Sequence, residues 1–256
     1  MKQFLTFTKK ELLEQLRTGK LLILTILFIL FGIMNPAMAK LTPWIMEISA
    51  DRLAESGMIL QKTEVNALTS WAQFFKNMPI ALIIFIVMSG NIFTTEYQTG
   101  TLINVVTKGM KRYKILAAKT IVMALLWTLE YLLAFGITYV YTAYFWDESI
   151  VRNVAFASFS LFLAGLWLIS IIPLASGLTS QSFAVLLTTG AAFLAAYLFG
   201  MLPDCADFSP SRLFSSPALL TGEGRLTDYT PALVTTSLLL VLNTAAAVIF
   251  FNKKSL

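Results

Sequence analysis

The chain has 256 residues, of which 57% are hydrophobic and 13% charged, with a formal net charge of +5. The mean hydropathy of +0.75 excludes an ordinary water-soluble domain, which could not bury so large an apolar fraction. The chain has no histidine and a single cysteine, Cys205, which excludes histidine metal ligands, histidine bases and an intrachain disulfide.

Six apolar segments divide the chain. About 20 helical residues cross the ~30 Å hydrocarbon core of a bilayer, where every backbone polar group needs a partner within the chain. We therefore predict an all-α integral membrane protein, with residues 1–256 forming one transmembrane domain. The predicted spans are residues 21–38, 78–93, 116–145, 154–174, 183–201 and 232–251.

The residues before the first span predict an interfacial elbow helix over 2–19. Four leucines share one face of this helix and polar residues surround most of the rest, although Lys9 lies within the leucine face. Such a helix lies on the inner leaflet with its apolar face in the lipid, and an ordinary cytoplasmic extension is the alternative. The leucines are Leu5, Leu12, Leu13 and Leu16.

Asn35 and Pro36 predict a kink or an end in the first span. The longest connection then follows over 39–76, outside the cell. Apolar residues at helical spacing over 65–75 predict an amphipathic helix that leads into the second span. This helix could cap the bundle or help release cargo.

The cytoplasmic loop between the second and third spans carries the clearest local signals. Gly100 predicts the end of one helix, residues 101–106 form a short helix, and Gly109 ends it. A short helix lying across the cytoplasmic face, continuous with two spans, could transmit force from a partner.

Two features lie inside the predicted spans. Glu130 stands near the middle of the third span, where a carboxylate costs roughly 2.5 kcal/mol or more and should face the bundle or water. It either gates a path or ties helices together, and Asn243 is a candidate partner by depth. In the fifth span, Gly190 begins a run of small residues that permits close helix approach, within the chain or in a dimer.

The charges predict the orientation. With both termini on one side, that side holds twelve of the 19 Lys and Arg residues and only three of the 14 acids. The positive-inside rule then places both termini in the cytoplasm. The basic excess therefore orients the protein, and no soluble basic domain exists to bind nucleic acid.

Catalytic signals are absent. The chain has no G-x-x-x-x-G-K-[ST] loop and no Ser-His-Asp set, and its acids show no metal-ligand spacing. We therefore predict no enzyme activity, no metal site and no cofactor bound by this chain itself.

The loop segment FTTEYQTGTL, residues 93–102, followed by Lys111, Arg112 and Lys119, resembles the corresponding loop of ABC-2 type transporter permeases. That family shows an acidic residue, Gly-Thr-Leu, an apolar pair, a basic element and a lysine that opens the third span. The usual proline is missing here. The elbow helix, six spans and internal termini match the family's layout.

The resemblance implies a permease dimer, expected to be a homodimer, bound to two cytoplasmic ATPase subunits that hold ATP and Mg. It implies a coupling helix at 101–106 and a translocation path between the second and fifth spans. The expected coupling residues are Glu96, Gly100, Thr101, Leu102, Val105, Val106, Lys111 and Arg112. The expected path residues are Phe85, Met88, Asn91, Glu130, Phe193 and Tyr197.

The compact chain is similar to bacterial permeases of bacitracin and lantibiotic immunity and of phenol-soluble-modulin export. The resemblance thus implies export of amphipathic or hydrophobic peptides from a bacterial plasma membrane; drugs, lipids or glycans are alternative cargoes. An ATP-independent secondary transporter or channel is a rival, for which Glu130 is the main sign. Cargo identity, homodimer against heterodimer, and secretion against self-immunity stay open.

Overall fold

The computed structural model describes residues 2–54, 65–107, 109–215 and 217–254. Across these ranges the chain forms helices and connections and no strand. The longer helices are α1 (Lys2–Arg17), α2 (Lys20–Ala54), α3 (Ala67–Ser89), α6 (Arg112–Phe145), α7 (Val154–Leu178), α8 (Ser182–Phe199) and α10 (Thr230–Lys253). The short ones are α4 (Thr94–Gln98), α5 (Thr101–Thr107), η1 (Glu148–Ile150), η2 (Ala206–Phe208), η3 (Pro210–Phe214), α9 (Pro217–Thr221) and η4 (Leu226–Tyr229).

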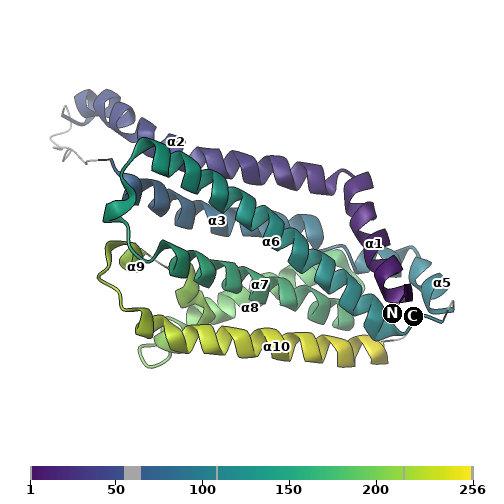
Figure 1. Ribbon diagram of the computed structural model, residues 1–256. Helices are drawn as coiled ribbons and strands as arrows, with labels where there is room; N and C mark the ends of the chain where they lie inside the picture. Colours follow the sequence, from purple (N-terminus) through teal and green to yellow (C-terminus); the bar gives the residue numbers. More distant parts are fainter. Residues whose placement is uncertain (1, 55–64, 108, 216, 255–256) are drawn as a thin grey trace.

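Six helical stretches are long and apolar enough to cross a membrane, which confirms the all-α, six-span prediction. The stretches are Lys20–Ile45, Ala67–Gln98, Arg112–Phe145, Val154–Leu178, Ser182–Phe199 and Leu226–Lys253. The spanning helices run side by side, α1 lies across one end of the bundle, and the two marked ends of the chain lie at that end, next to α5 (Figure 1).

The first spanning helix differs from its prediction. α2 neither ends at Pro36 nor gives way to a loop at residue 39, because the helix continues to Ala54. The buried Asn35 side chain donates to Thr138 Oγ1 of α6 at 3.0 Å and accepts from Asn77 of α3 at 2.9 Å. These contacts hold α2 in place where the proline removes a backbone hydrogen bond. The connection predicted over 39–76 is therefore helical at both ends, and residues 55–64 lie outside the described ranges.

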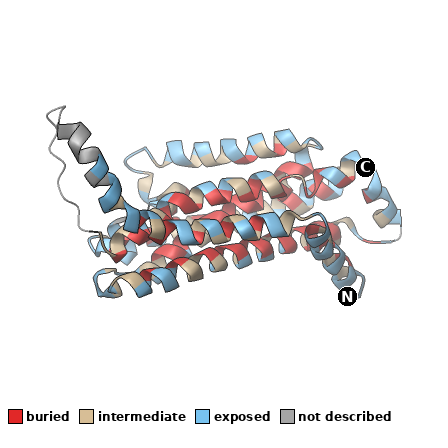
Figure 2. Ribbon diagram, turned by 90° about the horizontal axis from the view of Figure 1, so that it is seen from above, coloured by how far each residue is buried: buried red, intermediate tan, exposed pale blue. Residues whose placement is uncertain are grey.

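α7 occupies the centre of the bundle. Each span contains an apolar stretch of 18 residues. Within that stretch, 67% of the residues are buried in α7, but only 11% are buried in α8 and in α10. Figure 2 shows the buried residues concentrated along the helices in the middle of the bundle. At Gly165 of α7, an added Cβ would collide with the Trp127 ring of α6, so these two helices approach as closely as a glycine allows.

Polar contacts link α6 to α2 and α3 between Glu130 and Thr142. Thr25 donates to Glu130 Oε1 at 2.7 Å, and Thr138 donates to the Gly32 carbonyl at 3.1 Å. Farther along, the hydroxyls of Ser70 and Thr142 lie 2.7 Å apart. We call these contacts, together with those of Asn35, the polar seam.

Candidate functional site

The loop between α3 and α6 contains two short helices separated by glycine. Gly100 and Gly109 have φ of 67° and 83°, a region that side-chain-bearing residues rarely adopt. They set α5, Thr101–Thr107, apart from α4 and α6, at the positions where the sequence predicts the short coupling helix. α5 projects at the same end of the bundle as the two marked chain ends (Figure 1).

The surface of α5 differs from the expected one. Leu102 is only 3% exposed and packs in the chain's own core, so it is not available as an apolar anchor for a partner. Val105 and Val106 are half-buried against the same core. The outward apolar residue is Ile103, which is 46% exposed, with Thr101 and Asn104 exposed beside it. A seven-residue helix packed on a bundle must turn its most apolar face inward.

A cluster of charged side chains lies next to α5, where α1, α4 and α6 meet. Lys119, 2% exposed, contacts Glu11 Oε2 at 2.7 Å and Glu96 Oε2 at 3.2 Å, and donates to the Ile92 carbonyl at 3.0 Å. Lys10 contacts the other oxygens of Glu11 and Glu96, each at 2.9 Å. Glu96 therefore holds the loop to its own bundle and does not face outward. We call Lys10, Glu11, Glu14, Glu96 and Lys119 the ionic cluster.

The lysines and glutamates of the ionic cluster stabilise each other's charged forms. Burial alone would lower the pKa of Lys10, but hydrogen bonds to Glu14, Glu96 and Glu11 outweigh it and raise its pKa above the ordinary value. Burial likewise opposes ionisation of Glu14, yet its bond to Lys10 keeps the pKa of Glu14 below the usual range. Carboxylate oxygens of Glu11, Glu14 and Glu96 lie within 4.8 Å of one another, as in a cation site. The two ammonium groups already occupy that space, so the arrangement favours ion pairs over a metal.

α4 connects this cluster to the other half of the bundle. The hydroxyls of Thr94 and Ser182 lie 2.6 Å apart, and Gln98 donates to the Ser180 carbonyl at 3.2 Å, at the turn between α7 and α8. On the same element, the Tyr97 ring lies 3.9 Å from Lys254 Nζ. A displacement of α5 would therefore reach the end of α8 through a few short contacts.

The basic pair after α5 is split. Lys111 is exposed. Arg112 donates to the main-chain carbonyls of Asn252, at 3.3 Å, and Lys254. Lys254 in turn donates to the Ser176 and Thr179 carbonyls, each at 2.7 Å, at the end of α7, and burial lowers its pKa. Arg112 therefore secures the C-terminal end of the bundle, and of this pair only Lys111 is exposed and makes no ion pair with a described residue.

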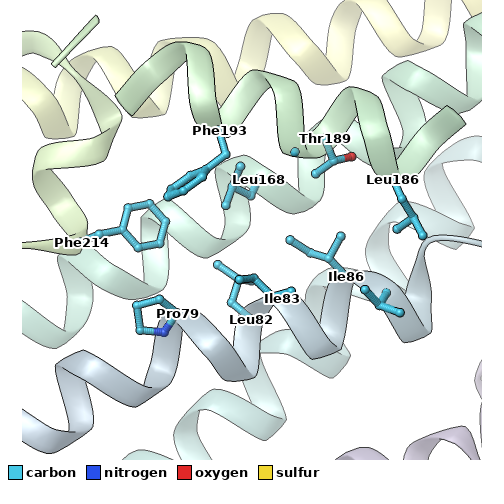
Figure 3. A pocket seen from close by; sticks show the side chains of 11 residues that line it. Pro79, Leu82, Ile83, Ile86, Leu168, Leu186, Thr189, Phe193 and Phe214 are labelled. Carbon is cyan, nitrogen blue, oxygen red and sulfur yellow. The ribbon is translucent and has the colours of Figure 1, made fainter. Parts of the chain in front are cut away.

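A second candidate site is an apolar cavity of about 260 Å³ between α3, α7 and α8. Figure 3 shows Leu82, Ile83 and Ile86 of α3 facing Phe193 and Thr189 of α8 across it. Thr189 donates to its own helix at Val185, so the cavity presents no unpaired hydroxyl. The remaining lining residues are Pro79, Val87, Leu168, Leu186, Gly190 and Phe214. Such a wall accommodates an apolar group and offers nothing to orient a charged one.

The predicted path residues are not gathered at this cavity. Phe193 lines it, and Tyr197 stacks on Phe193 with ring centroids 6.5 Å apart. Phe85 is fully buried against Trp127, on the opposite side of α3. Asn91 accepts from Lys20 at 2.7 Å. Met88 is half-buried against the core.

Glu130 is also separate from the cavity. It is fully buried, and its Oε1 accepts from Thr25 of α2. Asn243, the partner expected from depth, instead donates to Ser170 Oγ of α7 at 3.1 Å. Depth alone identified the wrong partner because the rotation of each helix, and not only its level in the membrane, decides which side chains meet. Gly190 likewise has no atom within 4 Å of an added Cβ, so the described chain uses no close approach there.

Sequence reasoning missed the partners of Glu96. In the sequence Lys10 and Glu11 belong to the polar side of a predicted elbow helix, but in the structure Glu11 and Gln15 turn inward together with Phe7. In the sequence, Lys119 stands out only as part of the loop motif. The detectable signal is a single lysine between the apolar residues 115–118 and 121–126, because a charge within an apolar helix needs a buried partner.

Neither a family model nor a curated protein matches this chain.

Proposed function

We propose that this chain is the membrane-spanning permease subunit of an ATP-driven exporter, acting as a dimer with two cytoplasmic ATPase subunits that bind ATP and Mg. The supporting observation is the way in which α5 is attached to the bundle. This short helix stands between two positive-φ glycines, and its base is held by the ionic cluster, in which Glu11, Glu96 and Lys119 are buried. Buried ion pairs cost desolvation energy. A loop that served only to connect two spans would not need such pairs to join α1, α4 and α6 at its base.

The proposal also places α5 and both termini in the cytoplasm, and the excess of basic residues at that end of the bundle supports this orientation. The apolar lining of the cavity between α3, α7 and α8 favours a cargo with large apolar side chains, such as an amphipathic peptide. Glycans would need polar groups that this cavity lacks.

The coupling role is tested at Ile103, the exposed apolar residue of α5. We expect the tagged chain, purified from its own membranes, to retain a P-loop ATPase, and Ile103→Asp to reduce that retention at least tenfold. A carboxylate forced into an apolar contact costs roughly 2 kcal/mol or more. Ile103→Leu is the matched control and should retain the ATPase.

Equal retention by Ile103→Asp, or ATP-independent transport by the purified chain alone, would contradict the proposal. Cargo is tested separately in inside-out vesicles that contain both subunits. ATP-dependent uptake of a labelled amphipathic peptide is expected. Uptake of a glycan instead would overturn the peptide assignment and leave the permease role in place.

A further inference from the structure

α1 separates its charges between its two faces. Glu11 is buried, and Glu14 pairs with Lys10 at 2.8 Å, so both acids are engaged in the ionic cluster. The opposite face carries leucines, with Leu5 63% and Leu16 51% exposed. It also carries exposed Lys9. Among the residues that the structure describes, Lys9 has no ion-pair partner. The outward face of α1 is therefore apolar and cationic.

A groove of about 420 Å³ runs between this helix and the start of α6. Phe4 and Leu5 of α1 and Ala117 of α6 give it an apolar floor, and Tyr113 and Lys114 line it from the first turn of α6. Lys114 makes no ion pair within the described ranges. Lys9 follows Leu5 by one helical turn, so it lies on the same side of α1.

We propose that this groove binds an anionic phospholipid of the adjoining leaflet. One acyl chain packs on Phe4, Leu5 and Ala117, and the phosphate lies against Lys114 and Lys9. The charge of the site selects this occupant. Its cations have no acidic partner among the described residues, and the end of the spanning helices is the level at which lipid phosphates lie. The proposal explains why a lysine interrupts the leucine face, since a long side chain on that face can extend to a phosphate.

The site does not depend on the proposed transport function, and its test uses binding alone. The purified chain in neutral detergent is titrated with dioleoylphosphatidylglycerol or dioleoylphosphatidylcholine, and thermal unfolding is followed by tryptophan fluorescence. We expect stabilisation by the anionic lipid at lower concentrations than by the zwitterionic one. The double variant Lys9→Gln, Lys114→Gln should weaken that response roughly thirtyfold, because each lysine near an anionic surface contributes about fivefold.

Two controls separate a built site from general attraction. Lys253→Gln removes an exposed charge at the same end of the bundle and should leave the response unchanged. Ala117→Trp fills the groove with every charge intact and should abolish the preference. The proposal is overturned if both lipids act equally, if the double variant keeps the preference, or if Lys253→Gln loses it as strongly. It is also overturned if glycerophosphoglycerol, which has no acyl chains, stabilises as well as the lipid.

Discussion

α6 and α8 are both spanning helices, yet they are held by different kinds of contact. α6 bonds to its neighbours through side chains from Lys119 to Thr142, and the polar seam joins it to α2 and α3. Among the described residues, α8 has such contacts only at its ends. Ser182 bonds to Thr94, and the Ala196 carbonyl accepts from Ser209 at 2.6 Å. Between these ends lies the apolar cavity.

The difference indicates how lipid-embedded helices choose partners. Lipid tails solvate apolar side chains as well as another helix does, so polar side chains and close backbone packing specify the pairing. In the part of the bundle formed by α6 with α1, α2 and α3, bonds between side chains therefore fix which helices lie next to each other. α8 is attached by side-chain bonds at its ends, and only 11% of the residues in its apolar stretch are buried. In the proposed exporter, α8 is therefore the wall of the cavity that a cargo could displace.

The largest expected effect comes from removing the central cation of the ionic cluster. Lys119→Met leaves Glu11 and Glu96 buried with one ammonium between them, which should cost about 3–5 kcal/mol. Unfolding in detergent measures this loss. Lys40→Met, at an exposed lysine over the Phe145 ring, is the control and should change stability by less than about 1 kcal/mol. An equally small change for Lys119→Met would show that the cluster does not hold α1 and α4 to α6.

A smaller effect is expected where α7 meets α6. Gly165→Ala pushes a methyl group into the Trp127 ring and should destabilise the protein by about 1–3 kcal/mol. Gly190→Ala on α8 meets no atom within 4 Å and should be neutral or slightly stabilising, because alanine favours helix by up to about 1 kcal/mol. The same unfolding assay compares the two. Equal costs would remove the distinction between a tight centre and a loosely held α8.

The smallest effect is expected at Glu130. In Glu130→Gln the amide oxygen can still accept from Thr25, so stability should change by less than about 1 kcal/mol. If the chain is the proposed exporter subunit, transport should also persist, because Glu130 then only ties α2 to α6. A well-folded variant that still binds the ATPase yet fails to transport would instead assign Glu130 to gating.

Much of the architecture follows from local chemistry and is therefore readable in the sequence. Runs of about 20 apolar residues must be helices in lipid, so six spans could be predicted. Gly100 and Gly109 punctuate the loop because of their own backbone freedom, so the position of α5 was also predictable. The kink or helix end predicted at Pro36 needed more than local chemistry to judge. The helix continues past Pro36, because the contacts of Asn35 with α3 and α6 compensate for the backbone hydrogen bond that the proline removes.

The pairing of side chains depended on the tertiary structure alone. Glu96 was expected to face a partner, and Leu102 to anchor one, yet the first binds Lys119 and Lys10 and the second lies in the core. Asn243 was expected near Glu130, where Thr25 stands instead. A hydrophobic sequence records how deep a residue lies in the membrane. The rotation of each helix about its axis is set by the sum of its contacts, which are distant in sequence and become adjacent only when the bundle packs.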